Sequence, residues 1–90
     1  MSAAVVHPYV TCKEGVQGGQ PVITGTRTPV RSIVLYHKLG EVPEEILEKL
    51  PHLTLAKIYD ALSYYYDHRE AIDRDIEANT EESVRREFGL

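Results

Sequence analysis

The chain has 90 residues, of which 42% are apolar and 27% are charged, and its formal net charge at pH 7 is −4. This length is enough for one small domain but not for a second hydrophobic core. The single cysteine, Cys12, excludes an intrachain disulfide, and no apolar run approaches the roughly 20 residues that span a bilayer. Because residues 1–6 lack the charged and apolar regions of a secretory signal, we expect a cytoplasmic protein with no membrane partner.

The charges are distributed unevenly along the chain. Residues 1–40 carry four basic and one acidic side chains, a net charge of +3, whereas residues 41–90 carry six basic and thirteen acidic ones, a net charge of −7. An overall negative charge opposes binding to nucleic-acid phosphates, but this polarity suits a basic face for DNA and an acidic C-terminal segment for a basic partner. An ordinary solvated acidic surface explains the same distribution, so both interpretations stay open.

Short β-favouring runs separated by glycines predict a hairpin over about residues 9–24. Its strands would be residues 9–12 and 21–24, with Gly15 and the Gly18-Gly19 pair between them. Two short strands are not stable alone in water, so the hairpin must pack on the helices or pair with its copy in a second subunit. A homodimer is therefore expected.

Three helices are predicted next, over about residues 29–39, 43–50 and 54–67. Thr28 is expected to cap the first, and Gly40 supplies the left-handed residue that ends it. Pro43 suits the first turn of the second helix, and Thr54 is expected to cap the third. Periodicity predicts buried apolar faces, made of Val30, Ile33, Val34 and Leu35, then Ile46, Leu47 and Leu50, then Leu55, Ile58, Tyr59, Leu62, Tyr65 and Tyr66.

The rest of the chain is predicted to form a helical extension over about residues 68–78 and a tail over residues 79–90. Lys57, Asp60, Ser63, Tyr64 and Asp67 should face solvent on the third helix, and whether that helix kinks near His68 is left open. In the tail, Asn79-Thr80 is expected to cap a short final turn. The fold class is thus mainly α, with a single domain over residues 1–78 in which a β-hairpin precedes a helix-turn-helix core.

The order of helices 43–50 and 54–67 predicts a helix-turn-helix, in which the start of the second helix enters the major groove of DNA. This nominates Thr54 and Lys57 to face DNA. Separately, residues 25–29 directly precede a helix N-terminus and could hold a phosphate, which nominates Arg27 and Arg31 as phosphate contacts. The alternative is that three short helices simply share a core, and that the glycine turn before residue 28 is only a helix start.

Signals of catalysis are weak along the whole sequence. The four histidines are scattered without metal-ligand spacing, and Cys12 has no identifiable histidine partner. We therefore expect a protein that is not an enzyme and that needs no cofactor or metal.

Several motifs in a fixed order resemble one known family. They are GGQPVITGTRTPV at residues 18–30, Gly40, PEEI at 43–46, PHLT at 51–54, ALSYY at 61–65, DHRE at 67–70 and Ile72-Asp73. Together, across about residues 7–78, they resemble domain of unknown function 433, whose members are described as VapB-like antitoxins. Val42 departs from the pattern, because a capping serine is frequent there; this should weaken the second helix by about 1 kcal/mol.

The resemblance implies a homeodomain-like helix-turn-helix after a β-hairpin. It also implies an antitoxin of a type II toxin–antitoxin system that neutralises a PIN-like ribonuclease toxin and represses the shared operon by binding operator DNA. The leading hypothesis is accordingly a dimeric antitoxin and transcription regulator, with Val84 and Phe88 anchoring the acidic C-terminal segment on the toxin. The alternative keeps the fold as a protein-interaction module without specific DNA binding.

Overall fold

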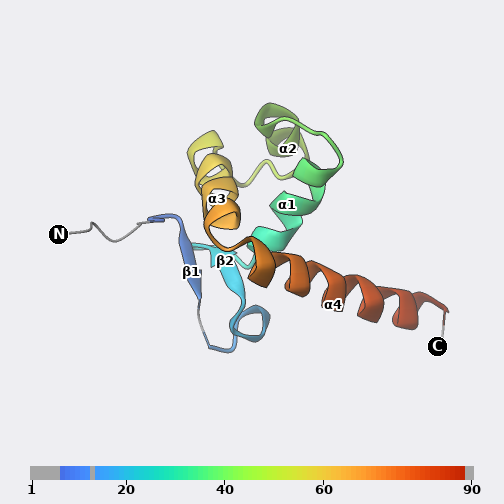
Figure 1. Ribbon diagram of the computed structural model, residues 1–90. Coiled ribbons are helices and arrows are strands. Elements are labelled where there is room, and N and C mark those ends of the chain that lie inside the picture. The colour runs from blue at the N-terminus through green and yellow to red at the C-terminus, as the bar shows by residue number, and fades with distance from the viewer. Residues whose placement is uncertain (1–6, 13, 89–90) are drawn as a thin grey trace.

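The computed structural model describes residues 7–12 and 14–88, with side chains as far as residue 79. The chain forms strands β1 (Val10–Cys12) and β2 (Pro21–Ile23), then helices α1 (Val30–Lys38), α2 (Pro43–Lys49), α3 (Leu55–Asp67) and α4 (Arg69–Phe88). In Figure 1, α1, α2 and α3 surround the core, the hairpin lies beside the end of α3, and α4 projects away from the core. The predicted fold class, a mainly helical protein with an N-terminal β-hairpin, is confirmed.

The hairpin forms where it was predicted, with β1 and β2 antiparallel and Thr11 opposite Val22. A 3-10 turn, η1 (Gln17–Gly19), lies in the connection, where the positive φ angles of Gly18 and Gly19 suit glycine. All three residues of β2 are buried. The hairpin is therefore attached to the helical core through β2, in addition to any pairing with another subunit.

The start of α1 differs from the prediction. Thr28 is not its cap, because the hydroxyl of Thr28 lies 2.7 Å from Nε2 of His52 instead. Pro29 precedes the helix in extended geometry and forms an isolated bridge with Val22. The Thr28 carbonyl accepts a hydrogen bond of 2.9 Å from the N–H of Ile23. The residues before α1 are thus used to join the helix to β2.

The end of α1 and the start of α2 follow the sequence closely. Gly40 has a φ of +90°, its N–H donates to the carbonyl of His37, and the N–H of Glu41 donates to that of Tyr36. This is the Schellman arrangement, which favours glycine at the left-handed position. Val42 precedes α2 without a capping side chain, although the Glu45 carboxylate accepts a 3.0 Å hydrogen bond from its N–H.

The core lies where α1, α2 and α3 meet, with β2 on one side and the first turns of α4 on another. Its buried side chains are Ile23, Val30, Ile33, Val34, Ile46, Leu53, Ile58, Ala61, Leu62, Tyr65 and Ile72.

Four of the predicted core residues lie on the surface. Leu35, Leu55, Tyr59 and Tyr66 are 40%, 36%, 53% and 55% exposed. For the three residues of α3, the prediction was wrong because this helix is covered along a narrower line, centred on Ile58, Ala61 and Tyr65. The rest of the fold packs on that line and leaves the neighbouring apolar side chains of α3 exposed to solvent. Leu35 lies on α1, where burial is limited to Val30, Ile33 and Val34.

A sharp break separates α3 from α4, which answers the question about His68. His68 has φ −134° and ψ 41°, so the helix ends there, and a new helix begins at Arg69. The predicted end at about residue 78 was wrong, since α4 continues to Phe88. Asn79 does not cap a new turn, because its amide donates to the main-chain oxygen of Asp75 at 2.7 Å and to its Oδ1 at 2.8 Å.

None of the helices in the described part of the chain combines the length and the apolar character needed to cross a bilayer.

Candidate functional site

The turn between α2 and α3 brings the start of α3 to the surface. Leu53 is the buried residue of this turn, while Pro51 and His52 are exposed. Thr54 caps α3 as predicted, since its hydroxyl accepts a 3.2 Å hydrogen bond from the N–H of Lys57. The start of α3 therefore exposes Thr54, with Lys57 partly buried beside it, at the position where a helix-turn-helix approaches DNA.

Arg27 lies beside this turn rather than on it. The neighbouring Thr28 contacts His52, so the loop before α1 touches the turn before α3. The Arg27 side chain is exposed, and its carbonyl accepts a 3.0 Å hydrogen bond from the side-chain amide of Gln17. Three of the predicted DNA contacts, Arg27, Thr54 and Lys57, thus belong to connected parts of one surface.

Arg31 is used inside the fold. Its Nη1 lies 3.2 Å from Oδ2 of Asp75 on α4, and its Nη2 donates to Oε1 of Gln17 at 3.1 Å. The side chains of Arg31 and Asp75 are only 14% and 5% exposed. A guanidinium held by a buried carboxylate is poorly placed to bind a phosphate, since it would first have to leave that partner.

Acidic side chains dominate the surface of the helix-turn-helix. Residues 41–67 contain six acidic residues and two basic ones. Glu44, Glu45 and Glu48 are exposed on α2. Lys49 forms an ion pair with Glu41, and this hydrogen bond raises the pKa of Lys49 above its usual value. This surface repels phosphates in the region where a helix-turn-helix contacts the DNA backbone.

An apolar groove opens between the α1–α2 loop and α3. Its volume is about 370 Å³. The residues that line it are His37, Gly40, Glu41, Val42, Pro43, Tyr59 and Leu62. Val42 and Tyr59 are about half exposed, and Leu39, next to Gly40, is 77% exposed. Because these side chains are apolar and open to solvent, the groove is a candidate protein-binding surface.

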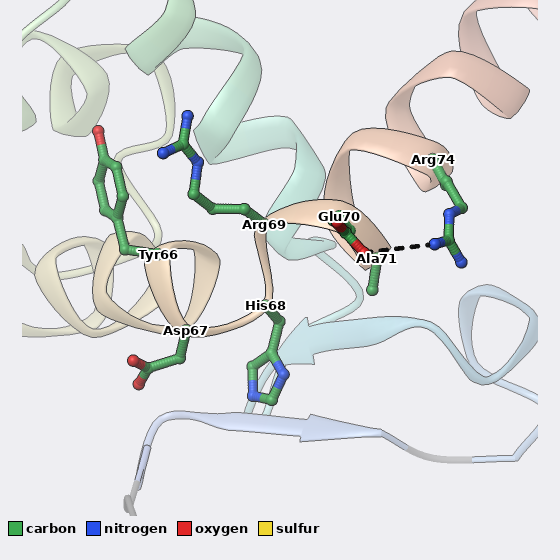
Figure 2. A pocket seen from close by; sticks show the side chains of 7 residues that line it. All are labelled: Tyr66, Asp67, His68, Arg69, Glu70, Ala71 and Arg74. Atoms are coloured by element: carbon green, nitrogen blue, oxygen red, sulfur yellow. Dashed lines mark ion pairs between the residues drawn. The ribbon is translucent and has the colours of Figure 1, made fainter.

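A second hollow, of about 460 Å³, lies at the elbow between α3 and α4. Figure 2 shows its side chains pointing in different directions, with Arg69 and His68 on opposite sides of the backbone. Arg74 pairs with Glu70 at 3.6 Å, and the Arg69 guanidinium lies 5.7 Å from the centre of the Tyr66 ring. Since the charged groups do not converge, the elbow does not resemble an anion or substrate site.

His7 forms a polar cluster that the sequence did not indicate. Its Nδ1 lies 3.3 Å from Oδ1 of Asp60, and its Nε2 lies 2.8 Å from Oδ2 of Asp67. Asp60 also accepts a 2.8 Å hydrogen bond from the N–H of Tyr9. Burial, with a smaller contribution from Cys12, raises the pKa of the nearby Tyr64. The N-terminal segment therefore covers part of the α3 face that was predicted to be open.

Comparison with known proteins identifies the family. Residues 10–65 match the family described as protein of unknown function (DUF433). The chain belongs to this family. A crystal structure of a DUF433 member from Anabaena variabilis ATCC 29413 is similar, with 38% sequence identity and a TM-score of 0.71. The similarity covers 77% of this chain and 68% of the other. No curated protein matches the chain.

The family match covers the hairpin and the core helices but not α4. It contains the surface formed by Arg27, Thr54 and Lys57 and all the residues of the groove. The predicted toxin anchors, Val84 and Phe88, lie outside the described side chains, so their placement stays a prediction. Within the described residues, no group of three or more histidine, cysteine, aspartate or glutamate side chains is arranged to hold a metal ion.

Proposed function

We propose that this DUF433 protein is a non-catalytic binding protein that serves as the antitoxin of a type II toxin–antitoxin pair. In this role it contacts a PIN-like ribonuclease toxin directly. The observation that carries the proposal is the surface of the helix-turn-helix, which exposes carboxylates on α2 and apolar side chains beside them. The resemblance to VapB-like antitoxins supports the same role.

The chemistry of this surface favours a protein over DNA. A ribonuclease needs basic side chains around the site that binds its substrate, because it must attract phosphates. Exposed Glu44, Glu45 and Glu48 attract such a surface and repel nucleic acid. The apolar side chains next to them supply the contact area that holds a protein partner after the encounter.

The test is co-expression with the ribonuclease encoded in the same operon, followed by co-purification and an assay of RNA cleavage. We expect a stable complex with reduced cleavage. In Glu48→Lys, association should slow by severalfold and lose much of its salt dependence, because one steering charge is reversed. The matched variant Glu14→Lys, an exposed glutamate of the hairpin connection, should behave as the unmodified chain. Failure of the two proteins to associate contradicts the proposal.

Operator binding is the second candidate function, and the exposed first turn of α3 favours it. Fluorescence anisotropy on the upstream DNA and on a scrambled fragment, at low and physiological salt, tests it directly. Preference for the upstream DNA at physiological salt supports a regulator. Replacing both Lys57 and Arg27 by alanine should then reduce the slope of log affinity against log salt concentration by about 2, because each lost phosphate contact removes about one unit. Arg74→Ala serves as the control.

A further inference from the structure

The groove beside α3 has one apolar wall from each of two elements. Tyr59 and Leu62 supply the wall on α3, and Val42 and Pro43 supply the wall at the start of α2. Tyr59 is 53% exposed and Val42 is 50% exposed. An apolar side chain inserted between them would remove exposed surface from both walls at once, which favours binding.

The polar groups around the groove are mostly acidic or engaged within the fold. Glu41 lines the groove but is paired with Lys49 and its side chain is only 15% exposed, whereas the exposed Glu44 and Glu45 follow directly in the first turn of α2. His37 is hydrogen-bonded to the hydroxyl of Tyr66 at 2.7 Å. The nearest lysines are paired, Lys38 with Asp73 at 3.0 Å and Lys49 with Glu41. The rim therefore complements positive charge.

We propose that this groove binds an amphipathic segment of the partner protein, in which apolar side chains are flanked by lysine or arginine. The apolar side chains would lie between Tyr59 and Val42, and the basic ones would reach the exposed Glu44 and Glu45. The inference rests on the proposed function, because it assigns the surface and the chemistry of the partner. A second copy of this chain fits less well, since a symmetric contact would bring two acidic rims together.

The probe is a synthetic amphipathic peptide of leucine and lysine, compared with a leucine–glutamate peptide and a serine–lysine peptide. Binding to the full chain is followed by backbone NMR shifts and by peptide anisotropy. We expect only the leucine–lysine peptide to bind, with shifts centred on the lining residues of the groove. Equal binding of the serine–lysine peptide, or shifts centred elsewhere, overturns the inference.

Two matched variants separate apolar docking from general attraction to an acidic protein. Tyr59→Glu places a charge in the apolar groove. The affinity for the leucine–lysine peptide should fall by more than about tenfold, although the variant carries one more negative charge. Leu35→Glu adds the same charge at a position of similar exposure outside the groove. This variant should bind the peptide with the affinity of the unmodified chain. If Tyr59→Glu binds as well as Leu35→Glu, the groove is not the site.

The co-expressed ribonuclease distinguishes failure of this inference from failure of the proposed function. Loss of the complex in Tyr59→Glu, but not in Leu35→Glu, supports the groove as the toxin contact. A ribonuclease complex that survives Tyr59→Glu overturns the groove while leaving the antitoxin role intact. If the peptide binds in the groove but the ribonuclease does not associate, the antitoxin role is wrong. The groove is then still a binding site for an amphipathic basic segment. A dimer that Tyr59→Glu converts to monomer assigns the groove to a second copy and overturns the inference.

Discussion

The helices α3 and α4 are consecutive in the chain, yet different interactions hold them in place. Ile58, Ala61, Leu62 and Tyr65 of α3 are buried in the core. The described part of α4 buries Ile72 and a charged residue, Asp75, which pairs with Arg31 of α1. Apolar burial tolerates small shifts, whereas an ion pair requires correct distances, so the attachment of α4 depends more on single polar contacts. The comparison predicts that α4 can be detached without unfolding the core.

The largest effect is expected for Ile58→Ala on α3. Ile58 is fully buried, and its truncation leaves a cavity that should lower the free energy of unfolding by about 2–5 kcal/mol. Denaturant unfolding followed by circular dichroism measures this loss. Leu55→Ala, on the same helix but 36% exposed, is the control and should cost less than about 1 kcal/mol. Similar losses in the two variants would mean that α3 is not held by burial along this line.

A somewhat smaller effect is expected for Asp75→Ala on α4. The change leaves Arg31 without its carboxylate, which should cost about 2–3 kcal/mol, below the usual range for buried pairs because Arg31 keeps Gln17 and some solvent. Hydrogen exchange should show faster exchange mainly for the amides of α4, while the amides of α1 and α3 stay protected.

The matched control for Asp75→Ala is Arg74→Ala on the same helix. Its ion pair with Glu70 is exposed and 3.6 Å long, so the change should stay within about 0.5 kcal/mol. If Asp75→Ala unfolds the core and α4 together, the two helices form one cooperative unit and the contrast between them is wrong.

Local signals predicted much of the fold. The hairpin, the left-handed Gly40 and the Thr54 cap each depend on residues close in sequence, and each was predicted correctly. The break at His68 could not be decided because neither proline nor glycine marks it. Leu55 and Tyr59 were wrongly placed in the core, since periodicity gives the direction of a side chain but not whether another element covers it.

The candidate site was harder to predict because its decisive contacts join distant residues. Arg31 and Asp75 are 44 positions apart, and His7 is 53 positions from Asp60. No local pattern connects such pairs. The sequence therefore offered Arg31 as a phosphate contact, and Asp60 as a solvent-facing residue, when both are used to hold other elements. Thr54 was placed correctly at the surface because a helix cap is a local feature, whereas Lys57 is partly buried.

A stabilising effect is expected for Val42→Ser at the start of α2. The hydroxyl of serine can accept a hydrogen bond from an N–H of the first turn, which the valine side chain cannot do, and this should add about 1 kcal/mol to the stability of the domain. The same change removes part of the apolar wall of the groove, so peptide binding should weaken while stability rises. Thermal unfolding and anisotropy on the same sample measure both. Parallel changes in stability and binding would show that Val42 acts only on the folding of α2.

The smallest effect concerns Asp73, which joins the first turns of α4 to α1 at the surface. The hydrogen bond from Lys38, followed by that from the Tyr65 hydroxyl, holds the pKa of Asp73 below its ordinary value of 3.8, and Asp73 in turn raises the pKa of Lys38 above 10.5. A lowered carboxyl pKa stabilises the fold above pH 3.8, and this contribution is lost as the pH falls below it. A raised lysine pKa stabilises below pH 10.5, and that contribution is lost as the pH rises further.

The stability difference between the unmodified chain and Asp73→Asn should therefore be largest near neutral pH and decrease toward both extremes. Asparagine can still accept the hydrogen bond from Tyr65, so the variant isolates the charge. Chemical denaturation at pH 3, 7 and 11 measures the difference, and Glu70→Gln on the exposed face of α4 is the control. A difference that stays constant with pH would show that Asp73 acts through its shape and not its charge. The charge of Asp73 would then add nothing to the attachment of α4, which would depend on Ile72, the Arg31–Asp75 pair and the hydrogen bond from Tyr65.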